Sequence, residues 1–467
     1  MIRTPLLLGL FIFAASAAVT AEVDDLRTRI TGSDWAGFLG PTGDSKSTEK
    51  GIITTWPDAG PRMIWKRKLA EGYAMPSSSK GRMFVFDRVR NSNRLICLKS
   101  ETGEEIWQFE YPTDFEDLLG YSGGPRCCPV IDDDRVYIVG GEGVLHCLSV
   151  TDGKVIWKKD TTKEFGVVKN FFGVGAAPVI EGDNLIMQVG GSPPGEGADL
   201  YAAGGKVKPN GSGIVAFNKK TGQVIYKIAD ELASYATPTL ATIGERRWCF
   251  SLSRGGLVGF EPKTGKVDFH FPFRSPTLES VNASSPIVID DHVFISETYG
   301  PGSAMLKVKP GGFDVVWADD EKRERLKSMQ THWNTAIHLD GYIYGSSGRH
   351  SGNAELRCIE AKTGNVMWSE SKVFVKAMNA DTRLTRCSLL YVDGHFVCLS
   401  EYGIVVLIKA NPKKFEPVAT SILNTAKDGE ARPLLEYPAW AAPILSHGML
   451  YLRGKHELVC LELIPAK

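Results

Sequence analysis

Short apolar segments and polar turns alternate along most of this chain, and they do so in a unit that recurs. Each unit starts with small residues, usually followed by proline, and continues through three apolar strands separated by polar turns. It ends with a Thr-Gly-like turn and a fourth strand that carries an aromatic residue. The copy from Cys127 to Trp157 shows every part. Short strands bounded by turn residues predict an all-β protein.

Eight copies of the unit can be aligned. They begin near Ala74, Cys127, Ala176, Ala236, Ser284, Thr335, Arg386 and Ala441. Four short antiparallel strands repeated every ~40–50 residues are typical of β-propeller blades. We therefore predict an eight-bladed β-propeller of four-stranded antiparallel blades. Seven blades, a β-helix and a pair of β-sandwiches are the structural alternatives.

The eighth copy lacks its last strand, and a matching strand lies at the other end of the chain. Residues 61–66 read Pro-Arg-Met-Ile-Trp-Lys, like the outer strands of the other copies. We expect this N-terminal strand to complete the last blade and to close the ring, which removes open sheet edges. The propeller domain is accordingly placed at residues 61–467, after a preamble at 22–60.

An aromatic residue follows the closing glycine of most units by four positions, as Trp157 follows Gly153. Its constant place on an outer strand predicts a structural role, in which the ring packs flat against the neighbouring blade. Five tryptophans are assigned to this docking role: Trp65, Trp107, Trp157, Trp317 and Trp368.

The first 21 residues predict a signal peptide. Arg3 supplies a positive charge, a short apolar stretch follows, and Val19-Thr20-Ala21 offers small residues for cleavage. The apolar stretch is too short to span a bilayer, and no later segment reaches about 18 uninterrupted apolar residues. We expect an exported protein, periplasmic or extracellular, without a transmembrane segment.

Charge narrows the range of partners. Lysine and arginine together number 54, and so do aspartate and glutamate. A chain with no net charge and no basic cluster is a poor candidate for binding nucleic acid through phosphate contacts. We expect a monomer whose ligand is a protein, a small molecule or a glycan.

Most of the nine cysteines are interpreted as packing residues. Cys97, Cys147, Cys358 and Cys460 share one repeat position, which holds Ala216 in another copy. A position that accepts alanine or cysteine is tight and buried, where cysteine acts as a small hydrophobe.

The turn and aromatic runs Thr151-Asp152-Gly153 to Trp157 and Thr363-Gly364 to Trp368 resemble the docking motif of quinoprotein-type propellers. The preamble Asp34-Trp35-Ala36-Gly37-Phe38-Leu39-Gly40-Pro41 resembles the start of exported PQQ-like repeat proteins abundant in planctomycetes. The resemblance covers nearly the whole mature chain. It implies one of two better-known classes: dehydrogenases that use pyrroloquinoline quinone (PQQ), or BamB-like propellers of outer-membrane assembly.

The dehydrogenase alternative rests on the adjacent Cys127 and Cys128. The resemblance implies that such a pair could form a vicinal disulfide against PQQ, held with Ca²⁺ and served by an aspartate base. Other copies place Ala-Ala, Ala-Thr or Ser-Ser at these positions, so two small residues are the simpler interpretation. The tryptophan-rich segment with a catalytic aspartate is missing, and whether the disulfide forms stays open.

The preferred hypothesis is a non-catalytic binding or scaffold module of the cell envelope, without a cofactor or metal. Loops that lead into the first strand of each blade converge on the channel mouth, where propellers commonly bind ligands. The candidate ligand-binding residues there are Arg126, Cys127, Cys128, Phe171, Phe172, Tyr235, Asn282, His332, Trp333, Asn334, Arg386 and Trp440; Asn170 and Arg349 lie in the same loops. A polysaccharide-binding surface protein is a third interpretation, which predicts exposed aromatic side chains in a groove.

Overall fold

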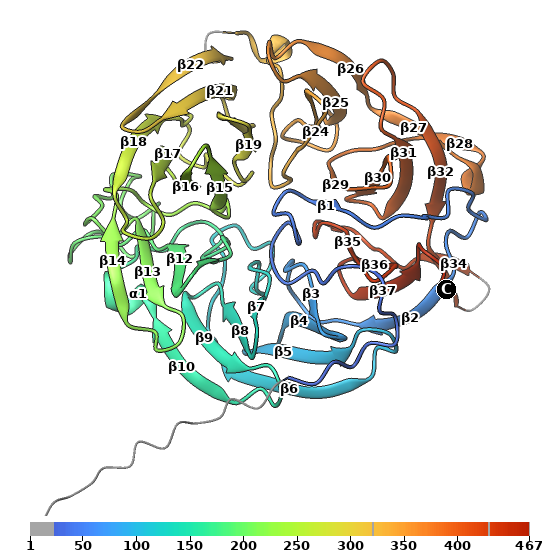
Figure 1. Cartoon of the computed structure of the whole chain (residues 1–467), viewed down its shortest axis with the longest axis horizontal. Helices are drawn as coiled ribbons and strands as arrows, with labels where there is room; N and C mark the ends of the chain where they lie inside the picture. Colours follow the sequence, from blue (N-terminus) through green and yellow to red (C-terminus); the bar gives the residue numbers. More distant parts are fainter. Residues whose placement is uncertain (1–22, 320–321, 428–429, 467) are drawn as a thin grey trace, which may run out of the picture.

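The computed structural model describes residues 23–319, 322–427 and 430–466. It confirms the predicted architecture: eight antiparallel sheets of four blade strands stand around a central axis (Figure 1). The predicted signal peptide, residues 1–21, lies outside the described residues. No helix in the described part of the chain is long and apolar enough to cross a membrane.

The first four blades follow one another along the chain, each running from an innermost to an outermost strand. Blade 1 is β3 (Ser77–Ser79), β4 (Arg82–Val89), β5 (Ser92–Lys99) and β6 (Glu105–Pro112); blade 2 is β7 (Val130–Asp132), β8 (Arg135–Val139), β9 (Val144–Ser149) and β10 (Val155–Asp160); blade 3 is β11 (Val179–Glu181), β12 (Asn184–Gln188), β13 (Ile214–Asn218) and β14 (Val224–Ile228); blade 4 is β15 (Thr239–Ile243), β16 (Arg246–Leu252), β17 (Gly256–Phe260) and β18 (Val267–Pro272).

The last four blades follow the same pattern. Blade 5 is β19 (Ile287–Ile289), β20 (His292–Glu297), β21 (Gly302–Lys309) and β22 (Gly312–Ala318); blade 6 is β23 (Ile337–Leu339), β24 (Tyr342–Ser347), β25 (Glu355–Glu360) and β26 (Val366–Glu370); blade 7 is β29 (Cys387–Val392), β30 (His395–Ser400), β31 (Ile404–Lys409) and β32 (Pro417–Ile422); blade 8 is β35 (Ile444–Ser446), β36 (Met449–Arg453), β37 (Glu457–Glu462) and β2 (Met63–Lys68). The N-terminal strand β2 pairs antiparallel with β37, with Trp65 opposite Cys460. The predicted ring closure is confirmed.

Other short elements decorate the ring. They are β1 (Lys46–Ser47), the hairpins β27–β28 (Lys372–Val375 and Ala380–Arg383) and β33–β34 (Asn424–Lys427 and Glu430–Pro433), the helix α1 (Thr161–Phe165) and two 3-10 turns (Glu324–Leu326 and Lys376–Met378). Strand β1 runs parallel to the innermost strand of blade 7 and so extends that blade to five strands. The repeat pattern did not predict these elements, because they lie outside it.

The outer-strand tryptophans join five of the eight blades to the next blade. The Trp107 Nε1 donates to the Val150 carbonyl at 3.0 Å, and the other four tryptophans of this position make the same kind of bond. A register shift accompanies this position in every blade, as between Val155 and Trp157. The residue opposite Trp107 across the sheet is Cys97, which explains why that repeat position holds small residues.

The turn glycine serves the same contact. Gly153 has a φ of +70°, and a Cβ placed on it would lie 2.6 Å from the Trp107 ring. A Cβ added to Gly222 or to Gly265 would likewise clash with the ring of Trp157 or of Tyr226. Glycine is therefore required twice, for the left-handed backbone and for the close approach of the neighbouring blade.

Alanine at Gly153 should lower the free energy of unfolding by about 2 kcal/mol, because backbone strain and a steric clash add. Gly341→Ala is the matched control, since Gly341 has a φ of +84° but no atom within 4 Å of an added Cβ. Its loss should be about 1 kcal/mol. Urea denaturation of both variants measures the difference, and equal losses would contradict a role for the glycine–tryptophan contact.

Candidate functional site

A pocket of about 320 Å³ lies on the propeller axis, where each blade runs into its innermost strand. Equivalent positions of the blades form its wall. The mouth ring, three positions before the repeat proline or its equivalent, consists of Tyr73, Arg126, Gly175, Tyr235, Ala283, Trp333, Arg386 and Trp440. The inner ring, two positions further on, contributes Met75, Cys128, Ala177, Thr237, Thr335, Ser388 and Ala442. Alternate residues of an extended chain share a side, which is why both rings face the axis.

The preamble closes the far end of the pocket. Phe38, Leu39 and Ser45 line the pocket from this segment. Backbone hydrogen bonds hold it to three blades: Trp35 exchanges both bonds with Ser78, the Ile131 amide donates to the Ala36 carbonyl, and the Tyr391 amide donates to the Ser45 carbonyl. The preamble therefore turns an axial channel into a blind pocket.

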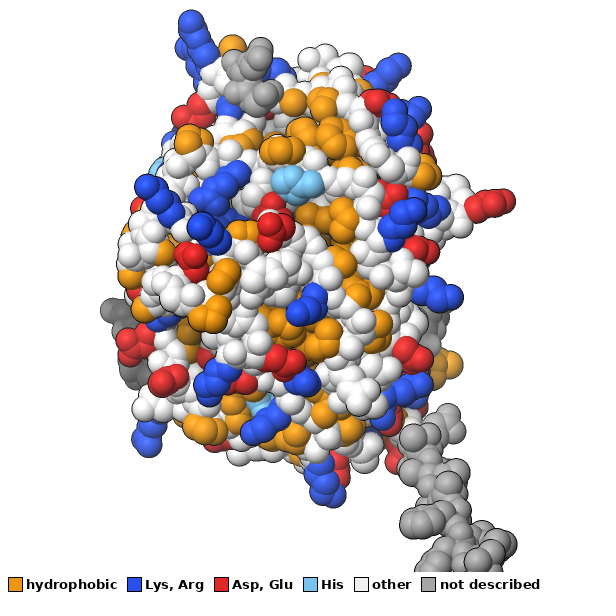
Figure 2. All heavy atoms as spheres, turned by 90° about the vertical axis from the view of Figure 1, so that its left-hand side faces the viewer, with side chains coloured by type: hydrophobic (Ala, Val, Ile, Leu, Met, Phe, Trp, Pro, Cys, Tyr) orange, Lys and Arg blue, Asp and Glu red, His pale blue; other side chains and the backbone are white. Residues whose placement is uncertain are grey.

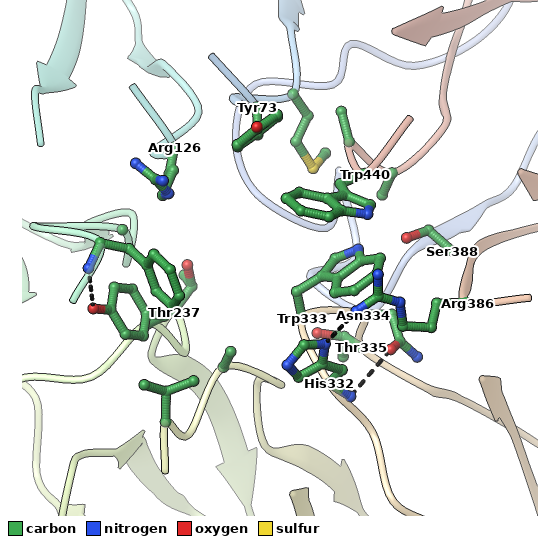
Figure 3. Close-up of a pocket in the computed structure, with 18 of the residues that line it drawn as sticks. Tyr73, Arg126, Thr237, His332, Trp333, Asn334, Thr335, Arg386, Ser388 and Trp440 are labelled. Carbon is green, nitrogen blue, oxygen red and sulfur yellow. Dashed lines mark hydrogen bonds between the residues drawn. The ribbon is translucent and has the colours of Figure 1, made fainter. Parts of the chain in front are cut away.

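Aromatic side chains form one wall of the pocket (Figure 3). The ring centroids of Trp333 and Trp440 are 4.9 Å apart at an interplanar angle of 46°, and Tyr73 lies 4.8 Å from Trp440. The Trp333 Nε1 is buried and has no hydrogen-bond partner within the described part of the chain.

Arg386 is held in this wall by a buried carboxylate. Its Nε and Nη2 donate to Glu401, with the Nη2–Oε2 distance at 2.6 Å, and the Glu401 side chain is fully buried. Burial raises the pKa of Glu401, but the hydrogen bonds and charge of Arg386 lower it by more, so the net pKa lies below the ordinary value. Glu401 also accepts the Trp440 Nε1 at 3.2 Å, and the Arg386 guanidinium lies 4.4 Å from the Trp333 ring centroid.

Arg126 repeats this arrangement across the pocket. Its Nη2 donates to Asp117 at 2.9 Å, and the Asp117 side chain is fully buried. The Asp117 carboxylate also accepts the backbone amides of Leu119, Tyr121 and Ser122, which shapes the loop between β6 and β7. Each arginine of the mouth ring is thus already neutralised by its own carboxylate.

His332 stands beside Trp333 and stays uncharged. Its Nε2 and the Tyr299 hydroxyl are 3.0 Å apart, and its Nδ1 lies 3.4 Å from the Arg386 Nη1. Burial, followed by the charges of Arg386 and Arg349, lowers the pKa of His332 to about 3. Burial raises the pKa of Tyr299 to about 12. Neither group changes its charge near neutral pH.

The side chains of the two adjacent cysteines lie in different surroundings. Cys128 lines the pocket, whereas the Cys127 Sγ donates to the Ala176 carbonyl at 3.2 Å. Both are free thiols, as are the other seven cysteines, and all nine are buried. Burial raises the pKa of the Cys128 thiol to about 12 and that of Cys127 further. Neither supplies a reactive thiolate near neutral pH.

The structure brings nine of the twelve sequence-predicted residues to the pocket: Arg126, Cys128, Phe172, Tyr235, His332, Trp333, Asn334, Arg386 and Trp440. It places the other three elsewhere. Cys127 and Asn282 face away from the axis, and the Asn282 Nδ2 donates to the Ser253 and Phe273 carbonyls. Phe171 is fully buried beneath the loop that carries Tyr201.

Sequence reasoning missed several lining residues. Tyr73 occupies the mouth-ring position of blade 1, so the repeat alignment itself contained the signal for it. Tyr121, Tyr299 and Glu279 lie in the loops between blades, and Phe38 in the preamble, where no repeat indicates a direction.

The pocket residues do not fit a site for PQQ and Ca²⁺. Ca²⁺ takes six to eight oxygen ligands, yet no group of three or more His, Cys, Asp or Glu side chains suited to a metal occurs among residues 23–319, 322–427 and 430–466. The carboxylates of Asp117 and Glu401 are bound to arginines, and Glu297 accepts the Ser280 hydroxyl at 3.0 Å and the Tyr299 amide. Of the three arginines that line the pocket, Arg126 and Arg386 are paired with carboxylates of the chain, which leaves Arg349 to meet the three carboxylates of the quinone.

The eight-bladed ring and its repeat define a PQQ-like β-propeller. The family model described as outer membrane protein assembly factor BamB matches residues 49–192 and 91–370, and the chain belongs to this family. BamB from Shewanella oneidensis is 25% identical over 268 residues, which cover 50% of this chain and 66% of that protein. An uncharacterized protein of Rickettsia conorii is 26% identical over 179 residues, 38% of this chain and 37% of that protein. The chain thus spans less than two thirds of either curated relative.

Solved structures share the fold. BamB from Moraxella catarrhalis superposes with a TM-score of 0.54 at 13% identity, covering 86% of this chain and 97% of that one. Quinohemoprotein alcohol dehydrogenase from Comamonas testosteroni superposes with a TM-score of 0.60 at 12% identity, covering 93% of this chain and 81% of that one. The same propeller therefore occurs in an assembly factor and in an enzyme, and the function of this chain depends on its own site.

Proposed function

We propose that this protein is an exported, non-catalytic binding module of the cell envelope, and that its axial pocket holds a neutral sugar unit. The mouth ring carries the proposal. All eight equivalent positions line one pocket; four are aromatic, two are arginine, and Gly175 and Ala283 keep the ring open. A mostly apolar pocket with a few fixed polar groups is the usual form of a small-molecule site, and 320 Å³ lies near the small end of the range.

The charges favour a neutral ligand. An anion would need free positive charge, but Arg126 and Arg386 are each bound to a fully buried carboxylate, and the third lining arginine, Arg349, shares the pocket with the carboxylate of Glu279. A cation at this wall would meet the positive guanidinium of Arg386, which lies 4.4 Å from the Trp333 ring centroid. A sugar needs an aromatic face together with donors and acceptors for its hydroxyls. Thr335 and Ser388 supply hydroxyl groups at the pocket wall, whereas the Asn334 side chain is bonded to the Ser346 carbonyl and the His332 amide.

The chemistry of the pocket supports binding over catalysis. A general base works best with a pKa near the operating pH, and the pKa of His332 lies at about 3. A cysteine nucleophile must form a thiolate, and the pKa of Cys128 lies at about 12. The residues also lack the oxygen ligands of a Ca²⁺–PQQ site, so the dehydrogenase alternative has no support from this pocket.

The predicted leader at residues 1–21 supports export, and membership of the BamB-like family supports a place in the envelope. On the side of the propeller shown in Figure 2, basic and acidic side chains alternate without a large patch of one sign. That pattern supports the expectation that nucleic acid is not a partner.

Alanine at Trp440 should weaken sugar binding about 30-fold, because an aromatic residue at the centre of a binding site typically contributes about 2 kcal/mol. Calorimetric titration of neutral monosaccharides and disaccharides into the protein measures the effect. Phe374→Ala is the matched control, since Phe374 is an exposed ring (52%) on the peripheral hairpin β27–β28. No binding of any neutral sugar, or equal binding by both variants, would overturn the proposal.

Calorimetry also tests the dehydrogenase alternative. PQQ titrated with Ca²⁺ should give no saturable heat. Micromolar or tighter binding that disappears in the Cys127→Ala/Cys128→Ala double variant would overturn the non-catalytic proposal and would call for an alcohol screen with an electron acceptor.

A further inference from the structure

A series of aromatic rings leads from the pocket to the surface. From Trp333 the ring centroids step 4.9 Å to Trp440, 6.0 Å to Tyr437 and 4.7 Å to Tyr402. Exposure increases along these four residues, here called the aromatic trail: Trp333 and Trp440 are partly buried, whereas Tyr437 is 40% and Tyr402 is 49% exposed. Tyr402 and Tyr437 stack on each other at 25°.

The trail is held in place by its own backbone. Tyr402 sits in the turn between β30 and β31, and Tyr437 and Trp440 lie in the segment that leads into β35. The Ala439 amide donates to the Glu401 carbonyl at 2.9 Å, which ties this segment to that turn. Trp440 is further fixed by its bond to the Glu401 side chain. The rings are therefore positioned before any ligand arrives, which lowers the entropy lost on binding.

We propose that the pocket and the aromatic trail together bind the end of a neutral oligosaccharide chain. The terminal sugar unit occupies the blind pocket against Trp333 and Trp440, and the following units lie over Tyr437 and Tyr402. This inference rests on the proposed function and extends it from one sugar unit to a chain with a defined direction.

The closed floor selects a chain end. Phe38, Leu39 and Ser45 line the pocket from the preamble, which spans the far end of the axis from blade 2 to blade 7, so a sugar chain enters the pocket from the mouth. The chain must leave by the mouth, where the outward sides of the stacked Tyr437 and Tyr402 rings are exposed to it.

The trail suits a sugar chain better than an extended peptide. Peptides in extended form are recognised mainly through rows of main-chain hydrogen bonds on an exposed strand edge. The trail presents side-chain faces with hydroxyl edges, and β1 already pairs with the inner edge of β29 in the blade that carries Tyr402. Tyrosine and tryptophan combine a large apolar face with a polar edge, which matches the alternating faces and hydroxyls of sugar rings.

The test uses the full mature chain and uncharged glucose and N-acetylglucosamine oligosaccharides of one to six units, with α-1,4 and β-1,4 linkages. Calorimetry gives the dissociation constant against chain length. Affinity should rise about threefold to tenfold per added unit, the gain expected from one further aromatic contact. The gain should stop once the rings of the trail are occupied.

Variants of the trail residues test whether the aromatic trail causes the rise in affinity with chain length. Tyr437→Ala and Tyr402→Ala should keep the affinity for a monosaccharide and should lose most of the increase with chain length. Tyr437→Phe should retain the increase, because the ring face remains. Phe374→Ala on the peripheral hairpin serves again as the control with an exposed ring removed.

The possible failures can be told apart. Equal affinity for one and six units in the unchanged protein would overturn the extended site and leave the proposed function standing. A length effect that persists in both alanine variants would also overturn it. Absence of binding to every sugar would remove the proposed function as well, and tighter binding of peptides than of sugars would replace the ligand class.

Discussion

Replacing Arg386 by methionine should lower the free energy of unfolding by about 3–5 kcal/mol near pH 8. The substitution leaves Glu401 charged and unpaired at a fully buried position, and an uncompensated buried charge typically has that cost. Methionine keeps an apolar side chain beside Trp333, so loss of packing contributes little. Urea denaturation of the two proteins side by side measures the change.

The effect should depend on pH, and its direction is set by the carboxyl group. In the unchanged protein the pKa of Glu401 is held below its ordinary value, so its stabilising contribution is present at neutral pH and is lost as the pH falls through the folded pKa. Without Arg386, burial, which raises the pKa of Glu401, is opposed only by the weaker effects of the hydrogen bonds from Trp440 and Ser351. The variant then gains stability relative to the unchanged protein as the pH falls. The destabilisation should be clearly smaller at pH 5 than at pH 8.

A second substitution tests whether the unpaired buried charge causes the destabilisation seen in Arg386→Met. Glu401→Gln added to Arg386→Met removes the charge and keeps an acceptor for the Trp440 Nε1. The double variant should recover most of the lost stability and should lose the pH dependence. A single variant that costs less than about 1 kcal/mol, or a double variant no more stable than the single one, would contradict this account of the pair.

Repetition is what made the fold predictable. All eight blades repeat the same strands, and most repeat the closing turn and its aromatic residue, so weak signals reinforce one another; Trp65 identified the strand that completes blade 8. Elements outside the repeat had no such support. Strand β1 and the hairpin β27–β28 occur once each, and their short segments carry no period.

The site was predictable to the extent that it matches the repeat. Arg126, Trp333, Arg386 and Trp440 share one repeat position, and all four line the pocket. Cys127 lies one residue away from that position, on the other side of an extended chain, which an alternation of two residues explains.

Features that depend on tertiary contacts could not be predicted in the same way. The pairing of Arg386 with Glu401 joins a residue just before β29 to one just after β30, and it neutralises the charge of Arg386 at the pocket wall. The closed floor is also tertiary: Asp34 to Pro41 indicated a family resemblance, but nothing in those residues showed that they cross the axis.

Alanine at Trp35 should remove the anchor of that floor. Trp35 is 1% exposed, and its ring covers Gly40, whose added Cβ would lie 2.6 Å from it. Loss of a fully buried tryptophan typically costs about 3–5 kcal/mol. Trp35→Phe should cost only about 1 kcal/mol, because an aromatic ring still fills the site and the Trp35 Nε1 has no partner among the described residues.

Trp35→Ala should destabilise the preamble locally and leave the blade strands folded. Three amides report on the floor from different blades: Ser78 bonded to Trp35, Ile131 bonded to Ala36, and Tyr391 bonded to Ser45. Their hydrogen exchange should accelerate together in the alanine variant and stay near the original rate in the phenylalanine variant, while amides within the blade strands are unaffected. The preamble forms the floor of the sugar pocket, and only the alanine variant should lose that floor. Sugar affinity should therefore fall in the alanine variant alone. Unchanged exchange at all three amides would show that the preamble is held without Trp35.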